Sequence, residues 1–175
     1  MGVLNVTPDS FSDGGQHATR DSALRHAEAL ILAGADLIDV GGESTRPGAT
    51  PVSEQQELDR VMPVIEALAG AVATPVSIDT SKAGVISAAT AAGAALINDV
   101  RALREPGALE AAAASGCLVC LMHMQGTPED MQDRPVYDRV IDDVVVFLES
   151  RVAACVDAGI DRGAIAVDPG IGFGK

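Results

Sequence analysis

Short apolar runs alternate along the chain with longer segments of helical pattern. The apolar runs, rich in Val, Ile and Leu, are Gly2–Val6, Leu37–Val40, Val76–Ile78, Ala95–Ile97, Leu118–Met122 and Ile165–Val167. Their hydrophobicity is nearly continuous rather than alternating with polar residues. Such runs are typical of strands in a parallel sheet, which are covered on both faces.

The segments between the runs carry the start and stop signals of helices. Ser53 and Gln56 have the spacing of a capping box, and glycines follow most of the apolar stripes. The predicted helices are Asp21–Ala33, Glu54–Ala69, one capped by Ser81 that ends near Gly93, one from Pro106 to near Gly116, and Tyr137–Ala158. Because Pro63 lies inside the second helix, we expect a kink or a break there.

Strand and helix alternate about six times, which indicates an α/β fold. Two architectures fit: an open doubly wound sheet and a TIM (β/α)₈ barrel. Nearly every predicted strand ends in polar residues, namely Asn5, Asp39, Asp79, Asn98 with Asp99, His123 and Asp168. A barrel gathers all of its strand ends around one mouth, whereas an open sheet concentrates chemistry at one switch point. The pattern therefore favours the barrel.

The length of the chain qualifies this assignment. A barrel usually needs about 250 residues, and this chain has 175. It ends in a glycine-rich loop directly after a predicted strand. We therefore expect residues 1–175 to form a single domain that covers about the first six βα units, an incomplete copy of a longer barrel.

Charge and composition exclude several partners. The net charge of −13 argues against nucleic acid and anionic membrane, both of which need basic patches. No apolar run reaches the roughly 18 residues of a membrane span, and a secretory signal pattern is missing, so we expect a cytoplasmic protein. Cys117 and Cys120 form a CxxC, but three positions apart on a strand they point to opposite faces, which favours a core role over a redox or metal site.

Three loops are candidates for chemistry. The first is Asn5–Gly15, long and polar for its position, and the third is Asp168 with the glycine run that follows. The second, Gly41–Gly48, offers hydroxyls, glycine amides and a guanidinium, a plausible phosphate cradle or an ordinary turn. Asp79, Asp168 and the pair Asn98-Asp99 could equally cap helices or bind a flat heterocycle with an amide-like edge. His123 could serve function or packing.

Taken together, the motifs resemble those of the dihydropteroate synthase family. The segments that carry the resemblance, in the family's order, are Asn5–Gly15, Gly41–Gly48, Ile78–Lys82, Ile97–Val100, Leu121–Gly126 and Asp168–Lys175. The resemblance implies a folate-pathway TIM barrel that condenses 7,8-dihydropterin-6-ylmethyl diphosphate with 4-aminobenzoate. The products are dihydropteroate and pyrophosphate, Mg²⁺ takes part, sulfonamides compete, and the full-length parent is a homodimer.

The resemblance also implies roles for individual residues. The implied roles are the pterin edge for Asp79, Asn98 and Asp168, a pterin-pocket wall for Met122, Mg²⁺ ligation for Asn5, diphosphate contacts for Thr45 and Arg46, and the aminobenzoate site for Phe11, Pro47 and Phe173. Cleavage at the pterin methylene gives a conjugated cation, so charge on the leaving diphosphate must be stabilised. Arg46 with Mg²⁺ would do this, and Asp79 or Asp168 would favour the developing positive charge.

Two motifs of the family are missing from this sequence, and two other functions also fit its residues. The family places a lysine and an arginine–histidine pair beyond the point where this chain ends, so we expect these residues alone to be inactive or weakly active. A pterin-binding methyltransferase domain would share the Asp and Asn contacts but has no use for the loop around Arg46. A non-catalytic pterin-binding homologue is the other alternative.

Overall fold

The backbone is one parallel sheet with its helices outside it. The computed structural model describes residues 1–6, 16–44, 50–128 and 130–175. The strands are β1 (Gly2–Asn5), β2 (Ile38–Gly41), β3 (Val76–Asp79), β4 (Leu96–Asp99), β5 (Leu118–Met122) and β6 (Ile165–Asp168). They form a six-stranded sheet in sequential order, and each neighbouring pair is parallel.

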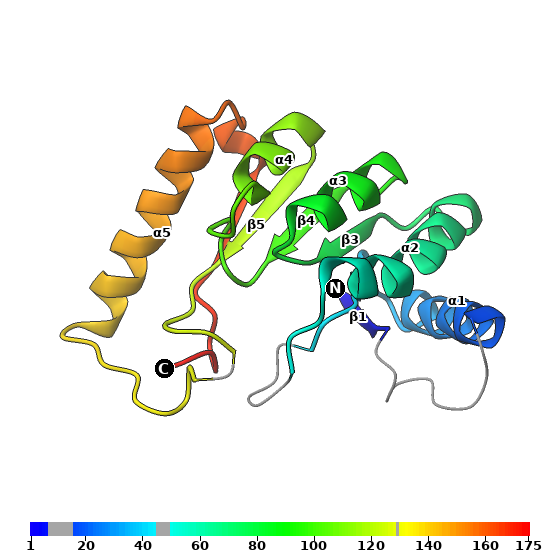
Figure 1. Ribbon diagram of the computed structural model, residues 1–175, viewed down its shortest axis with the longest axis horizontal. Helices are drawn as coiled ribbons and strands as arrows, with labels where there is room; N and C mark the ends of the chain where they lie inside the picture. The colour runs from blue at the N-terminus through cyan, green and yellow to red at the C-terminus, as the bar shows by residue number, and fades with distance from the viewer. Residues whose placement is uncertain (7–15, 45–49, 129) are drawn as a thin grey trace.

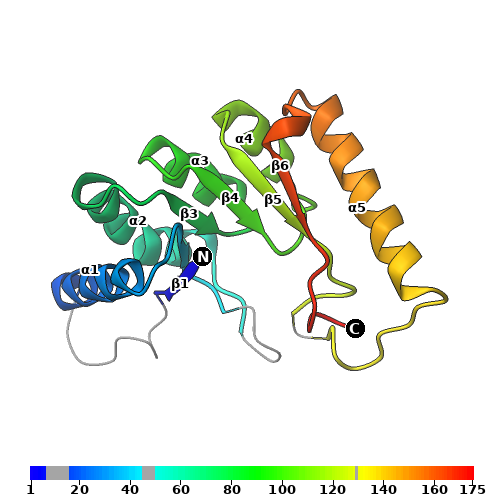
Figure 2. The same ribbon diagram turned by 180° about the vertical axis from the view of Figure 1, so that it is seen from behind.

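The helices follow the strands in turn. They are α1 (Gln16–Leu32), α2 (Glu54–Ala71), α3 (Ala83–Ala91), α4 (Ala108–Ser115), α5 (Val140–Asp157) and the short 3₁₀ helix η2 (Arg162–Ala164). Figure 1 shows them as an arc around the strands, and Figure 2 shows the strands from the side that the helices leave open. A doubly wound sheet reverses its strand order and carries helices on both faces. The sequential order and the one-sided helices confirm the barrel-type α/β fold.

The core lies between the sheet and the helices. Alternate strand residues such as Leu4, Ile78 and Leu121 are buried there against α1 to α4, with Ile65 and Leu68 of α2 among their partners. The other strand positions face the opposite, inner side. That inner face is more polar than the apolar runs suggest, and this is where the candidate site lies.

The observed helices and strands agree with the predicted ones except at some helix starts and at Pro63. Helix α1 begins at Gln16, five residues before the predicted start, while α4 and α5 begin at Ala108 and Val140, after their predicted starts. Helix α2 continues through Pro63, so of the expected kink or break the break is wrong, and the kink stays a prediction. Val61, Val64, Ile65 and Leu68 around Pro63 are almost fully buried. Their packing offsets the hydrogen bond that a proline removes.

Two capping predictions have opposite outcomes. The capping box of α2 is confirmed: Ser53 Oγ accepts a hydrogen bond from the Gln56 amide, and Gln56 Oε1 accepts one from the Ser53 amide. The predicted cap of α3 is wrong. Lys82 takes the N-cap position without a side-chain hydrogen bond, and the Ser81 hydroxyl donates to Asp99 instead.

Candidate functional site at the carboxyl ends of the strands

Strand register lines up three of the candidate residues across the sheet. Asn5 pairs with Gly41, Gly41 with Asp79, and Asp79 with Asn98. Neighbouring strands lie about 4.8 Å apart, so these side chains are close neighbours along one row. A Cβ at Gly41 would stand 3.3 Å from Asn5 Oδ1 and 3.5 Å from Asp79 Oδ2. Glycine therefore lets the two oxygens approach one small space at the sheet edge.

The Asn98 side chain is held by Asp39, which the sequence pattern had predicted at the end of a strand. Asp39 was predicted at a strand end, but β2 continues to Gly41, so Asp39 lies inside the strand and is 4% exposed. Asn98 Nδ2 donates to Asp39 Oδ2 at 2.9 Å. One Nδ2 hydrogen of Asn98 is therefore used within the protein, which leaves its second hydrogen and its carbonyl oxygen for a ligand.

The Asp79 carboxyl lies in an unfavourable environment for a negative charge. Burial raises its pKa well above the ordinary value, and the neighbouring charges of Asp39, Asp99, Glu57 and Glu43 raise it further. Asp79 also lines a cavity of about 140 Å³ at the end of the sheet. A ligand that brings N–H donors or positive charge to Asp79 would relieve this electrostatic cost.

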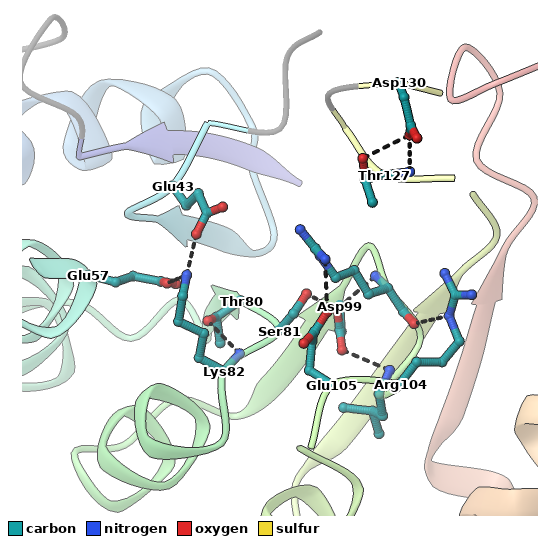
Figure 3. A network of polar contacts seen from close by, with 12 residues as sticks. Glu43, Glu57, Thr80, Ser81, Lys82, Asp99, Arg104, Glu105, Thr127 and Asp130 are labelled. Carbon is teal, nitrogen blue, oxygen red and sulfur yellow. Dashed lines mark hydrogen bonds and ion pairs between the residues drawn. The ribbon is translucent and has the colours of Figure 1, made fainter. Parts of the chain in front are cut away.

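Beside Asp79, one lysine joins two glutamates. Lys82 Nζ forms ion pairs with Glu43, from the loop after β2, and with Glu57, from α2 (Figure 3). Glu57 is 1% exposed. Burial disfavours the charged lysine, but its hydrogen bonds to the two carboxylates outweigh this and raise its pKa. We call Glu43, Glu57, Asp79 and Lys82 the carboxylate cluster.

The structure separates the roles of Asn98 and Asp99, either of which could cap a helix or bind a ligand. Successive strand residues point to opposite faces, so Asn98 faces the inner side while Asp99 is buried toward the helices. Its carboxylate accepts hydrogen bonds from the Ser81 hydroxyl and from the amides of Arg101 and Leu103, at 2.8 and 2.7 Å (Figure 3). Leu103 has a φ of 54°. Asp99 therefore stabilises a turn in the left-handed region and is not available to a ligand.

The remaining rim, above β5 and β6, carries an apolar group beside Asp168. Met122 is 4% exposed and packs with Val100, Met124, Met131 and Phe173, a group we call the methionine cluster. Polarizable thioethers and an aromatic ring suit the face of a flat heterocycle.

Asp168 adjoins this cluster. It pairs with Met122 across β5 and β6, and its Oδ1 accepts a hydrogen bond from the Gly170 amide at 2.7 Å. The structure thus places Asp168 and Phe173 near Met122. It gives Asp168 a part in the turn that follows β6.

The other sequence-predicted site residues have two outcomes. Phe11, Thr45, Arg46 and Pro47 lie outside the described residues. His123 serves packing: the residue is 5% exposed, and its ring meets Phe147 edge-on with centroids 4.9 Å apart. Burial lowers its pKa, which keeps the buried ring neutral.

The two cysteines of the CxxC diverge. Cys117 packs against the core and donates to the Ala94 carbonyl, whereas Cys120 lies near Asp168 and Asp39. Burial and those carboxylates raise the pKa of Cys120 to about 11. All three cysteines are free thiols. A thiol with such a pKa is unreactive, which argues against a redox site.

Sequence reasoning missed Lys82 and Glu57. A signal for Glu57 existed, since it stands four residues before Val61 on the buried stripe of α2. Within the described ranges, no group of three or more His, Cys, Asp or Glu side chains has the arrangement of a metal site. No helix among these residues is long and apolar enough to cross a membrane.

Fold and site together define a class of protein, and comparison with known proteins agrees. A family model described as pterin binding enzyme matches residues 1–175, so the chain belongs to the family of pterin-binding enzymes. It is 55% identical over its whole length to the dihydropteroate synthase of Escherichia coli K12, of which it covers 62%. The chain thus spans less than two thirds of that relative's length.

Solved structures give the same result. The Yersinia pestis dihydropteroate synthase with a sulfonamide drug superposes with a TM-score of 0.94 at 60% identity, covering all of this chain and 64% of that one. The Xanthomonas albilineans dihydropteroate synthase with 4-aminobenzoic acid gives 0.91 at 55% identity, covering 100% and 62%. The expected family and fold are therefore confirmed.

Proposed function

We propose that the protein to which this chain belongs is a dihydropteroate synthase of folate biosynthesis. It would join 7,8-dihydropterin-6-ylmethyl diphosphate to 4-aminobenzoate and release pyrophosphate. Membership of the pterin-binding family and the relatives' names support this. The observation that carries the proposal is the row of Asn5, Asp79 and Asn98 on neighbouring strands, at one edge of the sheet.

The pterin would lie between the carboxylate cluster and the methionine cluster. Its N–H edge would donate to Asp79, Asp168 and the carbonyl oxygen of Asn98, and Met122 would line the ring. The raised pKa of Asp79 supports this placement, because a buried carboxyl without enough donors gains most from a donor-rich ligand. Phe173, packed against Met122, would contribute to the aminobenzoate site with Phe11 and Pro47.

The diphosphate would be held at the other end of the row. Asn5 Oδ1 faces the space above Gly41, and a side-chain carbonyl is a ligand that Mg²⁺ accepts together with water and substrate phosphates. When bound there, Mg²⁺ would neutralise charge on the leaving diphosphate. Thr45 and Arg46 would contact the same group, with Arg46 offering a bidentate fork.

These roles suggest how the chain assists the reaction. The aminobenzoate nitrogen would form a bond to the methylene carbon as the carbon–oxygen bond to the diphosphate breaks. The bonding electrons would leave with pyrophosphate, and the amine proton would pass to solvent. Positive charge develops on the pterin during this step, and the carboxylates of Asp79 and Asp168 would stabilise it while Arg46 stabilises the leaving anion.

The experiment is a titration with the pterin diphosphate and with the bare pterin, each with and without Mg²⁺. A synthase is expected to gain affinity for the diphosphate when Mg²⁺ is added. Equal affinity for both pterins, unaffected by metal, would instead indicate a methyltransferase domain or a binding module. Arg46→Ala should weaken diphosphate binding roughly 10- to 100-fold and leave bare pterin binding largely intact.

Two expectations accompany the proposal. The resemblance predicts a homodimer, and the sequence pattern predicts a cytoplasmic location. Both stay predictions, which sedimentation and cell fractionation of the whole protein would test.

A further inference from the structure

We propose that Lys82 is a positioning residue for the loop after β2, which carries Thr45 and Arg46. This inference rests on the proposed function, since it concerns how that loop is presented to a diphosphate. Lys82 is not assigned any contact with the ligand. It would act by holding Glu43, two residues before Thr45, in a fixed place beside β3.

The ion pairs of Lys82 connect three separate elements. Lys82 lies between β3 and α3, Glu57 lies in α2, and Glu43 lies in the loop after β2. Glu57 is 1% exposed, whereas Lys82 and Glu43 are 25% and 21% exposed. The buried glutamate therefore fixes the lysine, and the lysine in turn reaches the more exposed glutamate at the beginning of the loop.

The base of the loop is also anchored on its other side. Arg60, one turn further along α2, donates to the carbonyl of Gly42 at 2.8 Å. A Cβ at Gly42 would stand 2.7 Å from Val61 Cγ1 and 3.0 Å from Glu57 Cγ. Gly42 therefore lies directly against α2, and Glu43 is the next residue that needs a fixed position.

Charge explains why the lysine is needed for this. Glu43, Glu57 and Asp79 all line the cavity that Lys82 also lines. Among the described residues, Glu57 Oε1 accepts no hydrogen bond. Without the ammonium, Glu43 would face two carboxylates at short range. Like charges at such separations repel strongly in a partly buried site, so Glu43 would turn away and the loop would keep only the anchor at Gly42.

Lys82→Met tests this, because it keeps most of the aliphatic stem and removes the charge. We expect the backbone amides of residues 41–44 to exchange hydrogen about tenfold faster or more. Binding of the pterin diphosphate should weaken about tenfold while that of the bare pterin changes far less. Arg25→Met, which removes an exposed positive charge on α1, is the matched control and should leave both measurements unchanged.

A second variant separates positioning from stability. Lys82→Met alone would leave the buried Glu57 carboxylate without its ion-pair partner. Combining it with Glu57→Gln removes that unpaired charge. The double variant should recover resistance to urea yet keep the fast exchange of residues 41–44. Recovery of slow exchange as well would mean that Lys82 only neutralises Glu57, and would overturn the proposal.

The exchange measurement also separates this inference from the proposed function. If the unaltered protein binds neither pterin, the proposed function fails, while the exchange of residues 41–44 still decides the role of Lys82. If the protein binds both and Lys82→Met weakens both equally, or leaves the loop amides unchanged, the positioning role is wrong.

Discussion

The two halves of the sheet rim are built on opposite principles. Above β2 and β3, the carboxylate cluster places Asp79 beside two glutamates that pair with one lysine. Above β5 and β6, the methionine cluster is apolar and well packed. The first half carries an electrostatic cost and the second contributes packing energy. The contrast indicates a ligand with a donor-rich edge on one side and a flat apolar face on the other, so both halves would bind the ligand but only the second would also stabilise the fold.

The largest expected effect lies in the turn beside the methionine cluster. Gly170 has a φ of +65°, and a Cβ there would stand 2.1 Å from the His123 carbonyl oxygen. We expect Gly170→Ala to lower the free energy of unfolding by about 3 kcal/mol or more, measured by urea denaturation. Gly172→Ala is the control. Its φ is +92° but no atom lies within 4 Å, so only the backbone strain of about 1–2 kcal/mol applies.

The next effect tests the packing of the methionine cluster directly. Met122→Ala should cost about 2–3 kcal/mol, because it leaves a cavity among Val100, Met124 and Met131. Ile171→Ala, at a side chain that is 86% exposed, should change the unfolding free energy by less than about 0.5 kcal/mol. Equal costs at the two positions would show that this half contributes no packing energy of its own.

The carboxylate cluster should respond in the opposite direction. Asp79→Asn removes a buried charge from among like charges, so we expect it to stabilise the protein by about 1 kcal/mol at pH 8. Asp36→Asn, at an exposed carboxylate before β2, should have little effect. Destabilisation by Asp79→Asn would show that the Asp79 carboxylate is well compensated in the folded state.

The pH dependence of that effect follows from linkage. The folded protein holds the Asp79 proton to higher pH than the unfolded chain does, because the pKa is raised. Asp79 therefore costs no stability at low pH and an increasing amount as pH rises through its folded pKa. The benefit of Asp79→Asn should be smaller at pH 5 than at pH 8. Comparing variant with wild type cancels the contribution of His123, whose lowered pKa acts in the opposite direction below about pH 6.5.

The sequence predicts the elements of this fold well, because strands and helices are local patterns. Strand β5 lies where the apolar run predicts it, and the cap of α2 is legible as Ser53 and Gln56. The misses arise where packing outweighs local preference. Pro63 stays within a helix since its neighbours are buried, and Ser81 gives its hydroxyl to Asp99 rather than to α3.

The site is harder to read from the sequence for a related reason. Strand ends reveal Asn5, Asp79 and Asn98, since parallel strands bring their carboxyl ends together. Lys82 lies 39 residues from Glu43 and 25 from Glu57 along the chain, and no periodicity links such positions. Asp39 looks like a strand end because its polarity interrupts an apolar run, yet a partner on another strand, Asn98, accounts for it.

The most direct test of the account is the affinity of the bare pterin for Asp79→Asn, measured by calorimetry beside wild type and Asp36→Asn. We expect Asp79→Asn to bind the pterin at least about tenfold more weakly, although it is the more stable protein. Asp36→Asn should bind as wild type does. Unchanged affinity in Asp79→Asn would contradict the claim that the row of strand ends through Asp79 holds the pterin.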